Sequence, residues 1–449
     1  MQGTDTTYTV WVIEPLEPLI VRDGRPFGPH PGARAVSLRF PFPSTTTGGV
    51  RTRAGLDATG RFDSSTIPEV KRIEVRGPLL VELDEAGQIS QYLPPAPADA
   101  LLLDGTSKRK SDESTTQGER DMGSTYANRP DSATGGAEDS KPVTLLWLRP
   151  RLLPGGALTN LPDGLLPVST DIRNPSKPLA NPPGFWAWPA FERWLFEPSD
   201  RELKLAELGG LAPMPETRMH VSIRTDTQTA AEGALFATQG LEFTALKAPQ
   251  VGDQDAVRLS SAVRLALAVA VSNAMPRAHN ITPGVAPLGG ERRIVCWRKA
   301  SEGEGKGLPL CPPALRERIA EDGACRLILL TPACFQMGWR PDWLFQPRYG
   351  VKPHLCGAVV GRPQVVSGWD FEKNRAKPSR RLAPAGSVFF LRLEGSRQDK
   401  QEWVDRHWMQ CISDDEQDRL DGFGLAALGV WPQAVCEDRR QVSGAGESR

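Results

Sequence analysis

The sequence predicts an α+β fold of two units with long glycine- and proline-rich insertions. Three observations favour this architecture. The 449 residues exceed what one hydrophobic core usually serves, so two domains are the expectation. Strand-like and helix-like patterns are mixed in both halves of the chain, which is typical of α+β proteins. The 43 glycines and 41 prolines imply many turns between short elements.

The first unit begins with a strand. Residues 6–14 (TTYTVWVIE) are rich in β-branched and aromatic side chains, and they predict this strand. Residues 72–83 predict a strand, a turn and a second strand, and residues 143–149 predict a further strand. Residues 190–207 carry apolar side chains at helical spacing, so we expect a helix there.

We place the boundary after the glycine pair at 209–210, which would end that helix. The first unit then covers residues 1–212 and the second covers residues 213–449. Residues 104–141 contain few apolar side chains, so they predict a flexible insertion in the first unit.

The second unit mixes strands with two helices. The Ala- and Leu-rich residues 259–274 are the strongest helix candidate in the chain. Residues 313–319 predict a second, short helix. The other patterns predict strands over residues 219–224, 234–236, 241–246, 326–332, 357–366 and 386–393.

The overall charge excludes a uniformly basic nucleic-acid-binding surface. Lys and Arg together number 54, and so do Asp and Glu, so any such surface must be local. No apolar run reaches the ~18–20 residues of a membrane span, and the N-terminus lacks a basic signal-peptide region. The seven cysteines form no CxxC pair. We therefore expect reduced thiols in a cytoplasmic protein.

Familiar catalytic motifs are missing from the sequence. It contains no G-x-x-x-x-G-K-[ST], H-E-x-x-H or G-x-S-x-G pattern. The five histidines are never three or four residues apart, so we predict no metal site and no cofactor. Residues 421–429 (DGFGLAALG) resemble a dinucleotide fingerprint only weakly, because no strand and acidic residue can follow. A glycine-rich loop beside RNA or a neighbouring strand is the preferred interpretation.

The segment 41–53 (PFPSTTTGGVRTR) predicts a helix that could hold an anion. Ser44 stands where an N-cap belongs, and helix N-termini bind phosphates. Arg51 and Arg53 add fixed charge, and the glycines let another backbone come close. The segment is therefore a candidate site for a nucleic-acid backbone. A capped surface helix with solvated arginines is the alternative.

Three local clusters of basic residues support a nucleic-acid partner. Residues 20–53 contain six arginines (22, 25, 34, 39, 51 and 53) and one acid, Asp23. Residues 362–381 contain six basic residues, with Trp369 and Phe371 between them. Cations paired with aromatic rings suit single-stranded RNA, because phosphates need charge and unstacked bases need a flat partner. The third cluster comprises Arg277, His279, Arg292, Arg293, Arg298 and Lys299.

Ten short segments in a fixed order carry a resemblance across nearly the whole chain. They are residues 14–19 (EPLEPL), 22–27 (RDGRPF), 43–51 (PSTTTGGVR), 216–223 (ETRMHVSI), 232–236 (EGALF), 288–293 (LGGERR), 330–332 (LTP), 368–370 (GWD), 384–388 (PAGSV) and 422–429 (GFGLAALG). In this order they resemble the RAMP-superfamily subunit of type III-B CRISPR effectors (the Cmr module) that caps the 5′-tag end of the crRNA.

The resemblance implies two ferredoxin-like (RRM-like) domains, no nuclease activity and a role in antiviral defence. It also implies binding of the crRNA 5′ tag, contacts with the large palm-domain subunit and the backbone RAMP subunit, and an indirect contact with target RNA. The candidate RNA-binding residues are Arg22, Arg25, Ser44, Thr45, Thr46, Gly48, Arg51, Arg53, Arg292, Arg293, Trp369, Lys377, Arg380, Arg381, Gly422 and Gly424.

Two other functions remain open at this point. A metal-independent endoribonuclease that processes guide RNA would need His220 or His30 beside a tyrosine or lysine, and the chain has only four tyrosines. A scaffold that contacts only proteins would use the same arginines to meet acidic neighbours.

Overall fold

The computed structural model describes residues 7–22, 34–105, 142–153, 158–171, 174, 176–246, 262–301, 307–370 and 375–432. Within these ranges the chain is α+β with mostly antiparallel sheets, as the sequence predicts. Arg25, His30, Phe371 and nearly all of the predicted insertion at 104–141 lie outside the described residues. No helix in the described part of the chain is long and apolar enough to cross a bilayer.

The first sheet collects strands from distant parts of the sequence. Its order is β14-β15-β1-β13-β3-β4, with β12 beside β13. Because β12–β15 all follow residue 212, residues 1–212 alone do not complete this sheet. The bounds are β1 Tyr8–Pro15, β3 Val75–Leu83, β4 Ile89–Leu93, β12 Thr244–Leu246, β13 Ala262–Ser272, β14 Gly284–Leu288 and β15 Arg293–Lys299.

The second sheet repeats the strand order of the first. Its order is β18-β23-β16-β25-β24, with antiparallel neighbours. Numbered by sequence within each sheet, β15-β1-β13-β3 and β25-β16-β23-β18 both follow the order 4-1-3-2. The bounds are β16 Ala324–Leu329, β18 Lys352–Val359, β23 Val388–Glu394, β24 Gln410–Cys411 and β25 Leu425–Val430.

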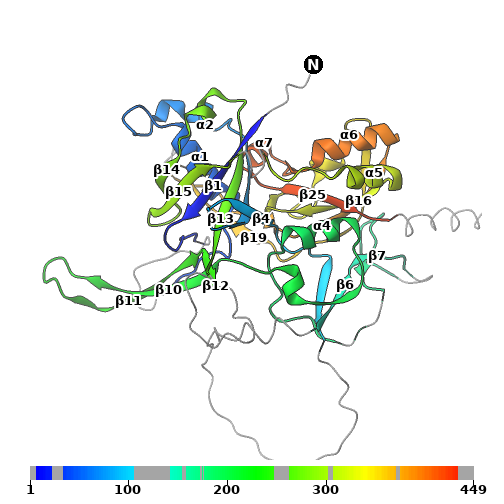
Figure 1. Ribbon diagram of the computed structural model, residues 1–449, viewed down its shortest axis with the longest axis horizontal. Coiled ribbons are helices and arrows are strands. Elements are labelled where there is room, and N and C mark those ends of the chain that lie inside the picture. Colours follow the sequence, from blue (N-terminus) through cyan, green and yellow to red (C-terminus); the bar gives the residue numbers. More distant parts are fainter. Residues whose placement is uncertain are drawn as a thin grey trace, which may run out of the picture.

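Short sheets and a long hairpin surround these two sheets. The hairpin of β10 (Met214–Ile223) and β11 (Ala230–Glu242) extends away from the body of the molecule (Figure 1). The other strands are β2 Arg34–Ala35, β5 Ala100–Asp104, β6 Pro142–Trp147, β7 Arg149–Pro150, β8 Val168–Ser169, β9 Arg201–Lys204, β17 Ala333–Cys334, β19 Gln364–Val366, β20 Trp369–Asp370, β21 Arg375–Ala376 and β22 Arg380–Ala383.

Helices cover both sheets. In Figure 1, α5 and α6 lie side by side over the second sheet, and α1 lies beside the first. The α-helices are α1 Pro43–Ala54, α2 Ile67–Val70, α4 Trp188–Phe196, α5 Pro313–Asp322, α6 Arg397–His407 and α7 Glu416–Leu420. The 3-10 helices are η1 Ser64–Thr66, η2 Leu205–Leu208, η4 Pro276–Asn280 and η6 Asp342–Phe345.

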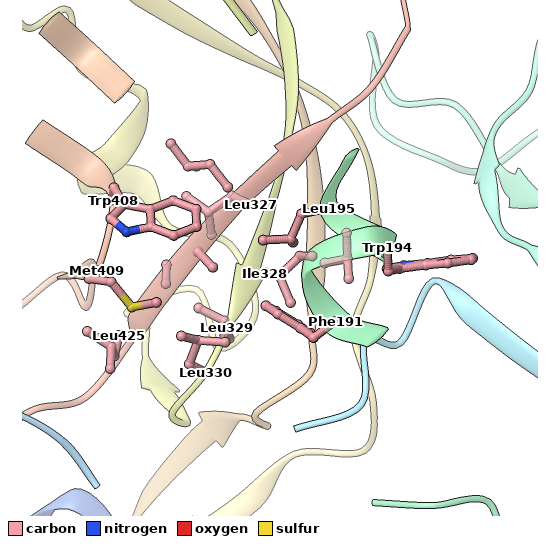
Figure 2. Packing of buried hydrophobic residues seen from close by; sticks show 14 of the residues in the cluster. Phe191, Trp194, Leu195, Leu327, Ile328, Leu329, Leu330, Trp408, Met409 and Leu425 are labelled. Atoms are coloured by element: carbon pink, nitrogen blue, oxygen red, sulfur yellow. The ribbon is translucent and has the colours of Figure 1, made fainter. Parts of the chain in front are cut away.

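One hydrophobic core joins the two sheets through α4. It includes Val10 and Val12 of β1 together with the buried residues of β16, β23 and β25. Figure 2 shows Phe191 and Leu195 of α4 beside Ile328 of β16. A second core fills the space between the opposite face of the first sheet and α1.

The helix predicted over residues 259–274 is wrong, because this segment forms β13 in the middle of the first sheet. Its large and small apolar side chains alternate along the strand. Leu265, Leu267 and Val269 enter the core against α1, whereas Ala266 and Ala268 enter the core shared with the second sheet. Burial on both faces stabilises the strand more than the helix propensity of Ala and Leu opposes it.

Two further predictions require correction. Residues 75–83 form one continuous strand, β3, instead of two strands separated by a turn, because β13 and β4 pair along it. The helix predicted over 190–207 is only α4, which ends at Phe196. Beyond it the chain extends into β9, which pairs with β6.

A fully buried ion pair connects α4, β16 and the segment before β5. Arg326 Nη1 donates to Asp99 Oδ2 at 2.7 Å, and neither side chain is exposed. Trp194 Nε1 donates to the other Asp99 oxygen at 2.9 Å, and Arg326 Nε donates to the Val430 carbonyl at 2.8 Å. The charges are therefore paired and their remaining polar atoms are bonded, as burial requires.

Removing one partner of this pair should destabilise the fold strongly. We expect Asp99→Ala to lower the free energy of unfolding by about 3–5 kcal/mol, because it leaves the buried Arg326 guanidinium without a counter-charge. The double variant Asp99→Ala/Arg326→Met should lose less than the sum of the two single variants. Chemical denaturation measures both. Arg318→Ala, which breaks an exposed pair with Asp322 on α5, is the control and should cost about 0.5 kcal/mol or less. Equal losses for Asp99 and Arg318 would contradict the expectation.

His407 is buried at the end of α6. Its Nδ1–H donates to the Trp403 carbonyl at 2.7 Å, and its ring stacks on Trp403 with centroids 4.1 Å apart. Burial lowers the pKa of His407 to about 4, against the opposing effect of the Trp403 hydrogen bond, and nearby Arg348 lowers the pKa further.

This depressed pKa predicts acid sensitivity. The folded protein keeps His407 neutral, whereas the unfolded chain binds a proton below pH ~6.5. Above pH ~6.5 His407 is neutral in both states and does not lower the free energy of unfolding. As the pH falls toward 4, the unfolded chain gains a proton that the folded protein does not, and the free energy of unfolding falls by about 3 kcal/mol in total. Denaturation at several pH values should show a shallower dependence in His407→Gln than in the parent chain. Parallel curves would contradict the prediction.

Candidate nucleic-acid interface

Helix α1 begins differently from the sequence prediction. Phe42 is the N-cap residue and Pro43 is the first helical residue, so Ser44 lies inside the helix and makes no cap hydrogen bond. The fixed φ of proline suits this first position. The buried Thr46 donates from Oγ1 to the Pro43 carbonyl at 3.1 Å. The N-cap prediction for Ser44 is therefore wrong.

The buried side of α1 docks onto the turn at residues 421–424, which lies just before β25. Thr47 Oγ1 donates to the Asp421 carbonyl at 2.7 Å. Arg51 Nη1 donates to Asp421 Oδ1 at 2.6 Å, and Arg51 Nη2 donates to the Ile73 carbonyl at 3.2 Å. The side chains of Arg51 and Asp421 are 14% and 12% exposed. Arg51 therefore holds the first unit against the second, and its predicted contact with RNA stays a prediction.

Two glycines make this turn possible. Gly422 and Gly424 have φ values of +94° and +84°, a region that favours glycine. A Cβ on Gly422 would lie 2.6 Å from the Gly77 carbonyl oxygen of β3. Both glycines and Thr46 are buried, so they offer RNA no surface in this conformation. The glycine-rich loop predicted over 421–429 is only this turn, since Leu425–Val430 forms the buried strand β25.

Arg380 is also engaged within the chain. It forms an ion pair with the largely buried Asp418 of α7 and lies over the Phe423 ring, 5.4 Å from its centroid. Burial opposes the charge, but the hydrogen bond to Asp418 raises the pKa of Arg380. Beneath this pair, a small cluster joins Phe42 and Phe423 to Leu382 of β22 and Val366 of β19. Arg380 therefore holds β22 against α7 within the second unit, next to the junction that Arg51 stabilises.

The glycine turn before β15 packs against residues 19–22. The Gly290 N–H donates to the Ile20 carbonyl at 2.7 Å, and Gly289 has φ +72°. Arg293 bonds Glu17 at 2.8 Å, and hydrogen bonds from the Ile294 backbone and from Arg293 lower the pKa of Glu17. Arg22 forms a long, exposed pair with Glu291 at 3.4 Å. This arrangement brings the basic cluster of residues 20–53 next to the one that contains Arg292 and Arg293.

Five exposed cations lie on segments that meet around this junction, and we call this set the basic seam. Arg22 lies beside Ser37 in a β-bridge, and Arg39 follows two residues later. Leu38 and Phe42, on either side of Arg39, pack against Leu382 and Val366. Arg381 of β22 lies opposite Val365 of β19. The seam comprises Arg22, Arg39, Arg292, Lys377 and Arg381, all exposed.

Four side chains of the basic seam form no hydrogen bond or ion pair in the described part of the chain: those of Arg39, Arg292, Lys377 and Arg381. Arg292 stands at φ +53°, in the turn before β15. An unpaired surface cation remains available to an external anion, which the paired Arg51, Arg293 and Arg380 are not. Arg39 belongs to a basic cluster of the sequence but is absent from the sixteen candidates. Only its tertiary position identifies it.

The remaining candidates lie around α1 and β20. Ser44 and Thr45 are half-buried, whereas Gly48 is exposed and a Cβ there would meet nothing within 4 Å. Arg53 donates to the Thr282 carbonyl and lies 5.4 Å from the centroid of the Trp297 ring, and burial lowers its pKa. Trp369 begins β20, which pairs with β21, and its side chain is outside the described residues.

His220 lies on the β10–β11 hairpin. Its Nε2 is 2.8 Å from Thr238 Oγ1, and its ring stacks on Phe236 with centroids 5.2 Å apart. No tyrosine or lysine contacts it among the described residues. Within those residues, no group of three or more His, Cys, Asp and Glu side chains could hold a metal ion. The six described cysteines are free thiols.

The same hairpin exposes apolar side chains that the sequence analysis did not single out. Met219, Val221 and Ile223 are 61%, 46% and 52% exposed, and Leu235, opposite Val221, is 53% exposed. They lie at alternate positions of β10 and at the paired position of β11. The alternation in MHVSI was visible in the sequence, but it predicts a half-buried strand. The structure leaves this face uncovered.

Comparisons with known proteins assign the family. The family model described as "CRISPR-associated protein (Cas_Cmr3)" matches residues 11–431. The chain belongs to the Cas_Cmr3 family. The resemblance to a subunit of the Cmr module is therefore confirmed at the level of the family. No curated protein matches the chain.

Two solved structures are similar to this Cas_Cmr3-family chain. A chain of the type III-B Cmr-beta complex bound to cognate target RNA and AMPPnP shares 12% identity, over 88% of each chain, with a TM-score of 0.40. A chain of the Cmr-beta complex bound to cognate target RNA shares 15% identity, over 85% of this chain and 86% of that one, with a TM-score of 0.41. Similarity at this level gives no residue-by-residue correspondence.

The docking of the 421–424 turn can be tested with two glycines of the Cas_Cmr3-family chain. Gly422→Ala should lower the free energy of unfolding by about 1–3 kcal/mol more than Gly60→Ala. Both glycines have positive φ, but only Gly422 lies against another backbone, whereas a Cβ on Gly60 would meet nothing within 4 Å. Chemical denaturation measures the difference. Equal losses would show that the turn tolerates a side chain and is not tightly docked.

Proposed function

We propose that this chain is a non-catalytic RNA-binding subunit of a cytoplasmic type III-B CRISPR effector complex, where it anchors the 5′ tag of the crRNA. The basic seam is the observation that carries the proposal. Its unpaired cations lie on three segments that are distant in the sequence, and several unpaired surface cations suit a nucleic-acid backbone. Membership of the Cas_Cmr3 family supports the same assignment.

The proposed fold is a pair of ferredoxin-like (RRM-like) domains. The shared strand order 4-1-3-2 supports it, since this is the order of the antiparallel ferredoxin-like sheet. The helix expected after the first strand is α1 in the first sheet, and the helix expected after the third is α6 in the second. The domains would then cover approximately residues 8–299 and 313–432, which moves the boundary from residue 212 to the segment between β15 and α5.

In the proposed mechanism, phosphates of the tag lie along the basic seam. Guanidinium and ammonium groups fix the register of the RNA without reading its sequence. Ser44, Thr45 and Gly48 form an open helical surface beside the seam, where a backbone could approach closely. The paired arginines, Arg51 and Arg380, keep the two halves of this surface in place.

The proposed complex also supplies protein partners. The uncovered apolar face of the β10–β11 hairpin supports a protein contact, because such faces are usually buried in an assembly. We assign this contact to the backbone RAMP subunit or the large palm-domain subunit. Target RNA would then meet this chain through the assembled complex.

We propose no catalytic role for the chain. His220 interacts with Thr238 and Phe236, and a ribonuclease working without metal would need a second acid or base beside it. Among the described residues, no hydrogen bond or ring contact joins His220 to a second acid or base.

Charge removal along the basic seam tests the proposal. Arg39→Gln, Arg292→Gln and Arg381→Gln should each weaken crRNA binding and lower the slope of log affinity against log salt by about one, since each removes one phosphate contact. Filter binding with 5′-labelled crRNA at two salt concentrations measures both. Arg318→Gln, on α5, removes an exposed charge outside the seam and should bind like the parent chain.

The same assay separates the rival functions. Removing the tag from the crRNA should lower its affinity, and the RNA should remain intact on a denaturing gel after incubation without metal. A discrete cut would identify a ribonuclease. Unchanged affinity in all three seam variants, together with weaker assembly of the complex, would identify a protein-only scaffold.

A further inference from the structure

A cavity of about 720 Å³ lies beside β18, the edge strand of the second sheet. None of its lining residues belongs to the basic seam. One wall is the loop at 161–166, which is attached to the strand by a hydrogen bond from the Leu166 N–H to the Cys356 carbonyl at 2.8 Å. The opposite wall is η6 with the residues next to it. Cavities of this size hold small molecules.

The cavity combines an apolar lining with cations. Leu165, Leu166, Phe345 and Leu355 are among its lining residues, and all four are buried or half-buried. Phe345 provides an aromatic ring from η6. A flat, apolar group of a ligand could pack here, because aromatic rings and aliphatic chains stack well on heterocycles.

Positive charge gathers on the β18–β23 side of the cavity. Lys352 and Arg392 line it, and neither side chain forms a hydrogen bond or an ion pair in the described part of the chain. Lys352 and His354 alternate along β18, and His354 lies opposite Arg392 of β23, so the three share one face of the sheet. Both cations are close enough to Glu394 to help lower its pKa, after the larger effect of its hydrogen bond with His354.

The acids that line the cavity leave a surplus of one positive charge, and Glu394, which lies opposite Lys352 but does not line the cavity, reduces it. Asp342 is paired with Arg340 at 2.6 Å. The other charged lining residues are one acid, Asp163, and two cations, Lys352 and Arg392. His354 Nε2 bonds Glu394 at 2.8 Å. The polar groups of Asp163, Gln346 and His354 could read the edge of a heterocycle. An anion at one end and a flat body at the other fit this lining.

We propose that this cavity binds a nucleotide, with the phosphate at Lys352 and Arg392 and the base against Phe345 and Leu165. The nucleotide is either a free mononucleotide or one nucleotide of a single-stranded RNA, because both carry the same chemistry. The site is independent of tag binding at the basic seam.

Isothermal titration calorimetry of the full chain distinguishes a free mononucleotide from a nucleotide within RNA. The ligands are adenosine monophosphate, uridine monophosphate, inorganic phosphate and hexauridylate RNA. Saturable 1:1 binding of a mononucleotide supports a free ligand. Binding of the RNA alone supports an RNA-borne nucleotide, provided that the cavity variants lose it.

Three variants tie the binding to the cavity. Lys352→Gln/Arg392→Gln should weaken binding at least tenfold, and Phe345→Leu should weaken it several-fold. Arg318→Gln, an exposed charge removal on α5, should bind like the parent chain. Arg39→Gln should retain mononucleotide binding even though it weakens crRNA binding, so the two proposals can fail separately. Circular dichroism checks that each variant is folded.

Several results would overturn the proposal. These are no binding of any ligand at millimolar concentration, inorganic phosphate binding as tightly as the nucleotides, or equal affinity in the double variant and the parent chain. Preferential binding of an acidic peptide such as hexaglutamate would assign the cavity to a protein partner instead.

Discussion

The guanidinium of Arg326 lies in the interior of the molecule, and the packing of the two units depends on its pairing with Asp99. A buried charge is tolerated only when a counter-charge and hydrogen bonds replace its water. Here Asp99, Trp194 Nε1 and the backbone carbonyls of α4 and β25 supply them. The pair therefore links α4 and the segment before β5 to the centre of the second sheet.

A second set of charges defines the junction at the surface. Arg51 and Arg380 reach Asp421 and Asp418, which lie at the two ends of one short stretch before β25. Since these arginines are paired within the chain, they position the surface, and the unpaired cations around them remain for an external anion. Residue type alone does not distinguish these two roles. An arginine at one position stabilises the fold, and an arginine at another presents its charge to solvent.

The two sheets share one strand order, but different elements cover their faces. In the first sheet, α1 covers one face and the shared core covers the other. In the second, α5 and α6 take the outer face (Figure 1). The edge strand β18 bonds the 161–166 loop at Cys356 and packs against β7 and β8 beside Gly357, and the cavity lies along residues 352–356. The basic seam and the cavity therefore lie on separate parts of the molecule, which allows each to bind its own ligand.

Local patterns and ordered motifs in the sequence predicted the α+β class, the first strand, the short helix α5 and the family. The sequence also located the basic clusters. It did not determine that residues 262–272 form a strand, since Ala and Leu favour a helix until partners on both sides and both faces bury them. Nor could it tell the paired Arg51 from the unpaired Arg39, because Asp421 lies 370 residues away from Arg51. Which charges are paired follows from the tertiary fold, because pairing depends on contacts between segments that are distant in the chain.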